Sequence, residues 1–150
     1  MALVLDASVS LKLALREPDS HRAEALLQVE ADLLVPDFWL GEATNVLWLQ
    51  VRRKLLTPEE ARDGLALLCA VIEPTNTTGM GLHEIALDIG IAANHSTYDT
   101  LYVAFAIAVG ASHLVVSDRA FVQAMSTHHD PVLAGMLIPL DSWARSHGVD

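Results

Sequence analysis

The sequence is short of cysteine and of basic residues, and both shortages restrict what the chain can be. Cys69 is the only cysteine, which excludes an internal disulfide framework and a cysteine-rich metal site. Its place in an apolar run predicts a small core side chain. Nine Lys and Arg stand against nineteen Asp and Glu, a formal net charge of −10 at pH 7. Since Lys and Arg supply most of the affinity for phosphates, this balance argues against nucleic-acid binding over the whole surface.

No apolar run is long enough to span a membrane. The longest, residues 101–111, is about half of the ~20 residues that a span requires. No cationic segment precedes an apolar one at the N-terminus, because Asp6 comes before Lys12, the first basic residue. We therefore expect no secretory signal, no membrane association and a cytoplasmic location. The 150 residues contain no linker or repeat, so we expect one domain over residues 1–150.

Short apolar runs alternate with longer helical segments along the whole chain. Strands are expected at residues 2–5, 33–35, 114–117 and 137–140. Helices are expected at residues 8–16, 20–29, 38–54, 58–72, 82–93, 97–110, 119–126 and after Asp141, with Asp37 and Asp141 as caps. Apolar strands separated by helices predict a mostly parallel sheet between two helical layers, a three-layer α/β/α fold. Right-handed crossovers then bring the carboxyl ends of all strands to one edge, where ligands bind.

Four acids stand where apolar residues would be expected. Asp6 and Asp118 close two of the predicted strands, and Glu42 and Asp99 lie in the first turns of two helices. All four can converge at one edge of the sheet, although they are far apart in sequence. Two like charges ~4 Å apart repel by about 1 kcal/mol in water and about 4 at an intermediate dielectric, so such a cluster needs protons or a cation. Oxygen ligands with no cysteine and no convergent histidine suit Mg²⁺ or Mn²⁺.

Each acid also has a purely structural interpretation. Asp6 and Asp118 can cap the helices that follow them, Asp99 can interact with a helix dipole, and Glu42 can extend into solvent. These interpretations are reasonable one at a time. Four acids on one predicted edge together favour a shared site.

The segments around these acids resemble those of a known family. Four motifs carry the resemblance: Val4-Leu5-Asp6-Ala7-Ser8, Glu42-Ala43-Thr44-Asn45-Val46-Leu47, Tyr98-Asp99-Thr100-Leu101-Tyr102-Val103-Ala104 and Leu114-Val115-Val116-Ser117-Asp118-Arg119. In order and spacing they are similar to the PIN-domain ribonucleases, and most similar to the VapC toxins of bacterial VapBC toxin–antitoxin systems. The similarity extends from Leu3 to about Leu140.

The resemblance implies a PIN-like, Rossmann-like fold and a metal-dependent endoribonuclease that cleaves RNA by activated water. Asp6, Glu42, Asp99 and Asp118 would be the catalytic acids and would bind the Mg²⁺ or Mn²⁺. Ser8 and Asn45 would orient a carboxylate or a metal-bound water; a helix cap and a hydrogen bond on the helix face are the structural alternatives.

The sequence departs from the family at one position. Many members have Thr two residues before the fourth acid, where this chain has Val116. Ser117, beside the acid, offers a hydroxyl from a different angle. The substitution affects the expected contacts of Asp118 and leaves the carboxylate itself in place.

Contact with RNA must come from a local group of cations. Arg119, next to Asp118, is the best candidate for a phosphate contact, and Lys12 and Arg16 on the first helix are further candidates. The triplet 52–54 more simply stabilises a helix C-terminus. We expect strongly salt-dependent binding and recognition of an exposed loop, such as a tRNA or rRNA loop, in place of duplex RNA.

Helix 38–54 is apolar around more of its circumference than one core contact requires. It either packs between two neighbours or provides a groove for a partner. The resemblance implies a homodimer and a cognate VapB-like antitoxin whose C-terminal segment lies along this groove. A basic side chain of that segment would reach the acidic pocket, and a strongly acidic toxin suits such a partner.

The sequence is also compatible in part with three other functions. A catalytically inactive PIN-like domain that only binds a metal or a partner shares the fold. A phospho-accepting receiver domain requires paired acids after the first strand and a late Lys, and Ala7 and Arg119 do not fit those positions. An aspartate-nucleophile phosphatase requires Asp-x-Asp, which Ser8 breaks. His95 is expected to be a solvated loop residue, and residues 128–129 cannot form a metal site on one helix face.

Overall fold

A computed structural model describes all residues, 1–150, and is built around a four-stranded parallel sheet. The strands are β1 (Ala2–Leu5), β2 (Asp32–Leu34), β3 (His113–Val116) and β4 (Leu137–Pro139), in the order β2-β1-β3-β4. Val4 of β1 pairs with Leu34 on one side and with Leu114 on the other. The expected parallel sheet is confirmed, and its order reverses at β1, which lies between β2 and β3.

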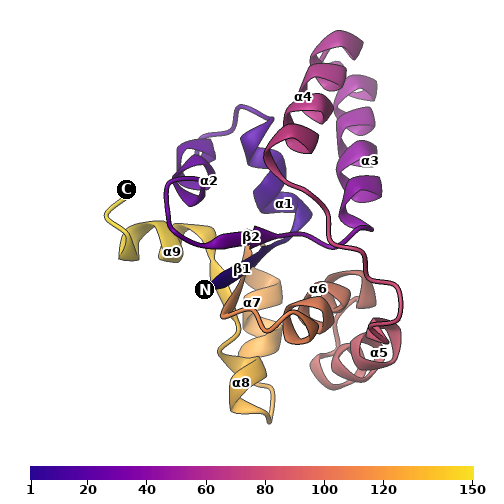
Figure 1. The fold of residues 1–150 in the computed structure, drawn as a ribbon, viewed down its shortest axis with the longest axis vertical. Helices are drawn as coiled ribbons and strands as arrows, with labels where there is room; N and C mark the ends of the chain where they lie inside the picture. Colours follow the sequence, from indigo (N-terminus) through magenta and orange to yellow (C-terminus); the bar gives the residue numbers. More distant parts are fainter.

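Helices cover both faces of this sheet (Figure 1). They are α1 (Ala7–Ser10), continued by the 3₁₀ turn η1 (Leu11–Leu13), α2 (Ser20–Leu26), α3 (Trp39–Arg52), α4 (Pro58–Val71), α5 (Leu82–Ala93), α6 (Thr97–Ala108), α7 (Arg119–Ser126), α8 (Pro131–Ala134) and α9 (Leu140–Ser146). No helix combines the length and the apolarity that a membrane crossing would require. The three-layer α/β/α architecture is confirmed.

Alternating strand residues supply two separate cores. Leu3 and Leu5 of β1 pack with α1, α2, α3 and α9, whereas Val4 packs on the opposite face with α5, α6 and α7. Most strand residues thus contribute to one helical layer or the other, which is why these strands are mainly apolar. Both faces of the central strands are buried, so Asp6 at the end of β1 is fixed by a rigid element.

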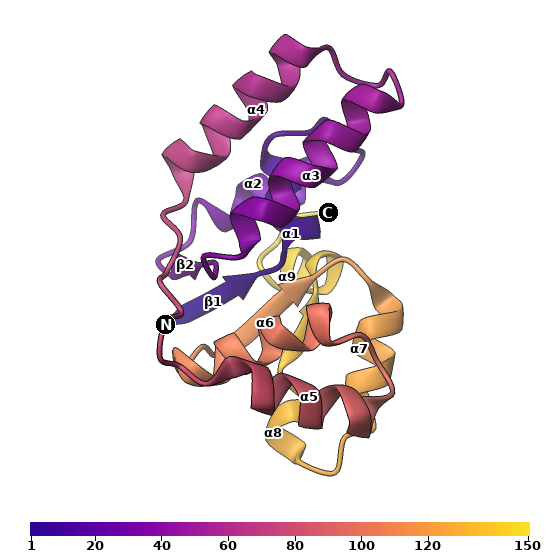
Figure 2. The same cartoon turned by 90° about the vertical axis from the view of Figure 1, so that its right-hand side faces the viewer.

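Helices α3 and α4 form a hairpin that projects from the body of the molecule (Figure 2). The start of α4 follows from its sequence. Thr57 accepts a hydrogen bond from the Glu60 backbone N–H, Glu60 accepts one from the Thr57 N–H, and Pro58 occupies the first helical position. The expected start of this helix is confirmed.

Several local predictions are corrected. The first helix does not run to Arg16 but ends in η1. Asp37 does not cap α3, because both its oxygens accept hydrogen bonds from Thr77. Cys69 is exposed, because α4 buries a narrow stripe centred on Gly64 and Leu68.

The C-terminal region differs in two further details. Asp141 lies in the first turn of α9 and does not cap it, since Pro139 takes the cap position. The short helix α8 was not expected. Asp130 caps it through the Val132 backbone N–H, and Pro131 is its first residue.

Candidate active site

The candidate site lies where the order of the strands reverses. Asp6 follows β1 directly and its backbone N–H donates to the Val115 carbonyl of β3. Asp118 follows β3 after one residue and starts α7. In open α/β sheets, ligands bind at the carboxyl ends of the strands at such a reversal. The sheet thus places two of the four predicted acids at its preferred ligand position.

Asp6 is held in one orientation by the start of α1. Its Oδ1 accepts hydrogen bonds from the Val9 backbone N–H (2.9 Å) and from the Ser8 hydroxyl (2.6 Å). These two donors are typical of a helix N-cap. Ser8 therefore contacts the predicted acid as expected, and Oδ2 of Asp6 is left without a protein partner.

Glu42 is brought to the site by the anchoring of α3. The buried Trp39 donates its indole N–H to the Ser10 hydroxyl (2.6 Å), which ties the first turn of α3 to α1. The Tyr102 hydroxyl on α6 then donates to Glu42 Oε2 at 3.1 Å. Phe38 packs edge-to-face on the Tyr102 ring, with centroids 5.3 Å apart. Burial and the neighbouring Glu42 carboxylate keep the pKa of Tyr102 far above its ordinary value, so it remains a donor.

Asp99 and Asp118 meet His95. One ligand atom of each of these three side chains lies within 4.8 Å of the other two, which makes a possible metal site. His95 Nε2 is 2.8 Å from Asp99 Oδ2, and its ring stacks on Phe121 with centroids 4.7 Å apart. Asp118 Oδ1 caps α7 through the Ala120 backbone N–H (2.9 Å).

His95 and Tyr102 are the two residues at the site whose positions sequence reasoning missed. Only 18% of the His95 side chain is exposed, so the expectation of a solvated loop residue is wrong. Its spacing of four residues before Asp99 is the signal that was available. Tyr102 lies within the motif that contains Asp99, but nothing in the sequence links it to Glu42, sixty residues away.

The electrostatics of the site confirm that three of the acids are close together. The pKa of Asp6 is raised to about 6, mainly by burial. The hydrogen bonds from Ser8 and Val9 lower this pKa, and the negative charges of Asp99 and Glu42 raise it. Burial also raises the pKa of Glu42, with Asp99 again adding to the effect. Asp99 therefore interacts with Asp6 and Glu42 on one side and lies beside Asp118 on the other.

Each of the four carboxylates uses one oxygen for a contact within the protein and keeps the other without a hydrogen-bond partner. The contacted oxygens are Asp6 Oδ1, Glu42 Oε2, Asp99 Oδ2 and Asp118 Oδ1. Acids that only capped helices would not need to gather, and their repulsion would go uncompensated. Fixed carboxylates with a free oxygen each, together with one imidazole, are a donor set that fits a divalent cation such as Mg²⁺ or Mn²⁺.

Asn45 and Ser117, the other two polar residues expected at the site, differ in burial. Asn45 is exposed one turn after Glu42 on α3, and its side chain makes no hydrogen bond. It lies on the same helix face as Glu42 because of this spacing. The Ser117 hydroxyl is buried and has no partner at all.

The three cations expected to contact RNA differ in their exposure and in their ion pairs. Lys12 is withdrawn from the surface, since its ammonium pairs with Glu17 at 2.6 Å and its side chain is only 10% exposed. Burial opposes the charge of Lys12, but these carboxylate contacts leave its pKa raised. Arg16 is exposed in the loop after η1. Arg119 is exposed next to Asp118 and pairs with Asp141 of α9.

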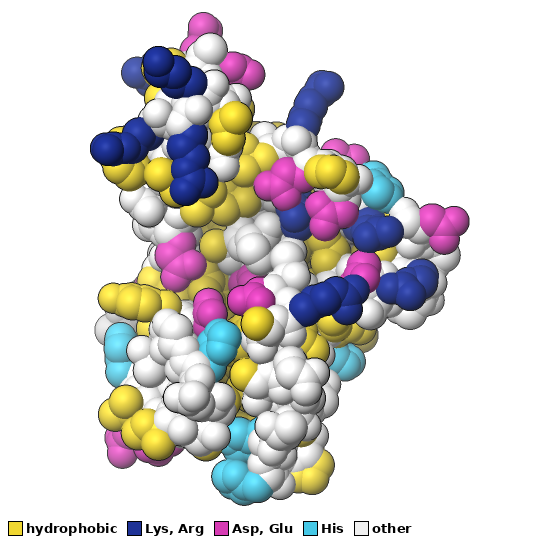
Figure 3. All heavy atoms as spheres, turned by 180° about the vertical axis from the view of Figure 1, so that it is seen from behind, with side chains coloured by type: hydrophobic (Ala, Val, Ile, Leu, Met, Phe, Trp, Pro, Cys, Tyr) yellow, Lys and Arg dark blue, Asp and Glu magenta, His cyan; other side chains and the backbone are white.

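The basic side chains fall into two groups around the acidic site (Figure 3). One group covers the tip of the α3–α4 hairpin, and the other lies on the side formed by α2, α7 and α9. No Lys or Arg occurs between residues 63 and 118.

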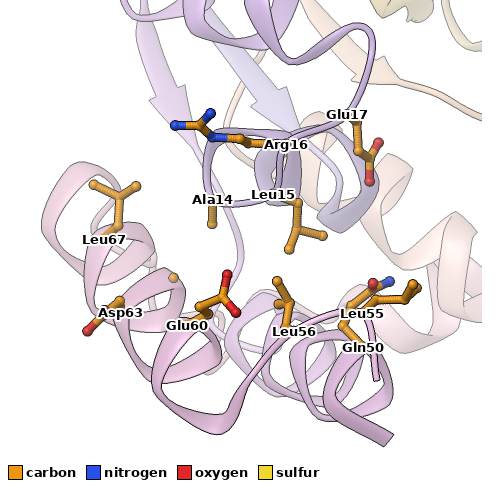
Figure 4. A pocket seen from close by; sticks show the side chains of 11 residues that line it. Ala14, Leu15, Arg16, Glu17, Gln50, Leu55, Leu56, Glu60, Asp63 and Leu67 are labelled. Atoms are coloured by element: carbon orange, nitrogen blue, oxygen red, sulfur yellow. The ribbon is translucent and has the colours of Figure 1, made fainter. Parts of the chain in front are cut away.

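A groove of about 620 Å³ lies between the hairpin and the loop after η1 (Figure 4). Leu55, Leu56 and Leu67 form its apolar lining, opposite Ala14 and Leu15. The remaining lining residues include the acids Glu17, Glu60 and Asp63. This groove is built mainly by α4 and the connection before it, whereas helix α3, which was expected to provide a groove, contributes only Gln50. Trp48 of α3 is 54% exposed on the hairpin.

Comparison with known proteins agrees with this geometry. Residues 3–125 match the model of the PIN domain. Ribonuclease VapC3 of Pyrobaculum aerophilum is 31% identical over 126 residues, covering 82% of this chain and 94% of that protein. The crystal structure of PAE2754 from Pyrobaculum aerophilum has a TM-score of 0.71 and 18% identity, over 99% of this chain and 90% of that one. The crystal structure of Mycobacterium tuberculosis VapC20, a sarcin–ricin loop cleaving toxin, has a TM-score of 0.64 and 20% identity, and the match covers 82% of this chain and 95% of VapC20. The chain therefore belongs to the PIN domain family, among its VapC-like members.

Proposed function

We propose that this protein is a metal-dependent endoribonuclease and the toxin of a type II toxin–antitoxin pair. The observation that supports this most strongly is the cluster of four anchored carboxylates, each with a free oxygen, at the carboxyl ends of β1 and β3. The similarity to a ribonuclease over most of the chain supports RNA as the substrate.

The divalent cation would be held by Asp6, Glu42, Asp99 and Asp118, with His95 close enough to join them. Bound there, Mg²⁺ or Mn²⁺ supplies a Lewis acid and activates water for attack on a phosphodiester. The protein contributes fixed geometry, because each acid is oriented by a donor on a neighbouring element. Ser8 orients Asp6, Tyr102 orients Glu42, and His95 orients Asp99.

The RNA would be a single-stranded loop, such as one of a tRNA or rRNA. The site is an open edge of the sheet, and Asp118 and Arg119 are both exposed there. An exposed loop can enter such a site without a duplex having to be opened. Arg119 and Arg16 are the predicted cations that remain available to phosphates, whereas Lys12 is occupied by internal ion pairs.

The partner would be a VapB-like antitoxin with a basic C-terminal segment in the groove of Figure 4. Its apolar lining and the acids Glu17, Glu60 and Asp63 suit an amphipathic, cationic chain. The exposed Trp48 and Val71 on the hairpin suit a homodimer contact. Such a pair would act in the cytoplasm, where its RNA substrates are.

The proposal is tested by incubating the purified protein with total RNA in Mg²⁺ or Mn²⁺, and again in EDTA. We expect cleavage only with the cation. Asp99→Asn should reduce the rate by at least ~10²-fold, since it removes the acid shared by both halves of the cluster. Asp88→Asn, on the exposed face of α5, is the matched control and should cleave like the wild type.

Two results would contradict the nuclease proposal. Cleavage that persists in EDTA excludes a metal-dependent mechanism. If the wild-type protein binds Mn²⁺ at these acids but cleaves no RNA, it is a catalytically inactive PIN-like domain that only binds a metal or a partner.

A further inference from the structure

A second polar pocket lies beside the acidic cluster. It has a volume of about 170 Å³ and is lined by Asp19 and Arg22 of the α2 region, Ser117 and Arg119 near β3, and Leu140 and Asp141 of α9. Only Leu140 is apolar. Ser117 is the residue immediately before Asp118, so the pocket adjoins the candidate active site.

The only two buried side-chain atoms without a hydrogen-bond partner in the whole protein belong to the lining of this pocket. They are the Nε of Arg22 and the Oγ of Ser117. Buried polar groups are nearly always paired, because leaving one unpaired costs about 1–3 kcal/mol. Two such groups in one small pocket indicate that a polar ligand completes them.

The charges of the pocket indicate the sign of that ligand. Asp19 pairs with Lys12 at 3.0 Å, and Asp141 pairs with Arg145 at 3.2 Å and with Arg119. Asp141 therefore lies between two arginines, and Asp19 shares Lys12 with Glu17, so both carboxylates of the pocket have cationic partners other than Arg22. Arg22 makes no ion pair and no side-chain hydrogen bond, although it is not exposed. A half-buried guanidinium without a counter-charge is costly, and an anion would compensate it.

The geometry of the donors favours a phosphate. A guanidinium presents several N–H donors in a planar fork that matches phosphate oxygens, and the Ser117 hydroxyl adds one more donor. Arg119, whose side chain is 69% exposed and pairs with Asp141, lines the same pocket and is a second cation beside such a ligand. We propose that this pocket is a phosphate subsite that binds an RNA backbone phosphate next to the one being cleaved, with Arg22 as its principal cation.

This inference rests on the proposed function, because it takes RNA as the ligand. Its test uses binding in the absence of cleavage. A short fluorescein-labelled single-stranded RNA is titrated with the Asp6→Asn protein in EDTA, and fluorescence anisotropy gives Kd between about 50 and 200 mM salt. Arg22→Ala and Ser117→Ala are introduced into this background. Arg22→Lys keeps the charge and removes the fork.

We expect Arg22→Ala to weaken binding by roughly tenfold and to lower the slope of log Kd against log salt by about one. Arg22→Lys should weaken binding less and keep the slope, and Ser117→Ala should weaken binding by a few-fold. Arg62→Ala on α4 removes the same charge far from the pocket and is the matched control. Thermal unfolding identifies any variant that fails to fold, and Ser117→Ala, which removes an unpaired hydroxyl, should be as stable as its parent.

Unchanged affinity in folded Arg22→Ala and Ser117→Ala proteins would overturn the subsite, as would an unchanged salt slope in folded Arg22→Ala or an equal effect of Arg62→Ala. The wild-type cleavage assay is independent of this result. If the wild type cleaves RNA but the pocket variants bind RNA normally, the nuclease proposal stands and only the subsite is excluded. If the pocket variants lose RNA binding but the wild type cleaves no RNA, the subsite stands and the nuclease proposal is excluded.

Discussion

Asp99 is the residue at which the two halves of the candidate site meet. Its charge raises the pKa of Asp6 and of Glu42, and its carboxylate shares a possible metal site with His95 and Asp118. Without a cation these charges oppose one another, so part of the folding free energy is spent on holding them together.

The raised pKa of Asp6 predicts how this repulsion depends on pH. The pKa is about 6 in the folded protein against an ordinary 3.8. Well below pH 3.8 the side chain is neutral in both states and costs nothing. As the pH rises from about 4 to about 6, the unfolded chain releases this proton while the folded protein keeps it, so the metal-free protein loses stability, and the loss is complete above pH 6.

Replacing Asp6 by Asn should therefore stabilise the metal-free protein. Asn keeps the oxygen that caps α1. In EDTA at neutral pH, we expect the variant to gain about 1–3 kcal/mol and several degrees in Tm, a gain that shrinks as the pH falls toward 4. Mn²⁺ should raise the Tm of the wild type and not of the variant. Equal stabilisation of both proteins by Mn²⁺ would show that Asp6 is not part of the metal site.

Single residues also show where prediction from sequence stops. Asp6 and Asp118 were placed by a local rule, since each follows a buried strand. Arg22 was not singled out, because an arginine in a helix is ordinary until its neighbours are known. Only the packing of α2 against α9 and η1 reveals that its Nε is buried and unpaired.

At the scale of elements, the close packing of α5 on α6 positions His95 and Asp99. A Cβ added at Gly90 would lie 3.0 Å from the His95 carbonyl oxygen and 3.0 Å from Thr97 Cγ2. The buried Thr100 hydroxyl donates to the Ala86 carbonyl at 2.7 Å and joins the same two helices. Gly90 thus allows the loop before α6 to approach α5.

Gly90→Ala should therefore destabilise the protein by about 1–3 kcal/mol, because the loop must move away. Gly41→Ala is the matched control, since no atom lies within 4 Å of its added Cβ on the exposed side of α3. It should stabilise α3 by up to about 1 kcal/mol. Urea unfolding midpoints measure both changes. A destabilisation of similar size in both variants would contradict the packing argument.

The elements themselves were largely predictable. The expected bounds 82–93 and 119–126 are those of α5 and α7, because these helices have clear caps and breakers in the sequence. The first helix was overestimated because Leu11–Leu13 keep a helical pattern while the chain tightens into η1. Cys69 was misplaced because α4 belongs to a projecting hairpin, and a sequence pattern does not say that one face lacks a neighbour.

At the scale of the whole molecule, an acidic chain approaches a polyanion through the arrangement of its charges. A net charge of −10 opposes binding in general, yet the cations are concentrated at the hairpin tip and beside α2, α7 and α9. The acids between these two groups become an advantage only when a cation occupies them. The sequence predicted the acids and their convergence, whereas the positions of the cations around them required the fold.

The most direct test of this account is anomalous diffraction from crystals soaked in Mn²⁺, measured at the manganese absorption edge. The account predicts a peak at the carboxyl ends of β1 and β3, within ligand distance of Asp6, Glu42, Asp99 or Asp118, and no such peak in Asp99→Asn crystals. A peak elsewhere on the molecule, or none in the wild type at saturating Mn²⁺, would contradict it.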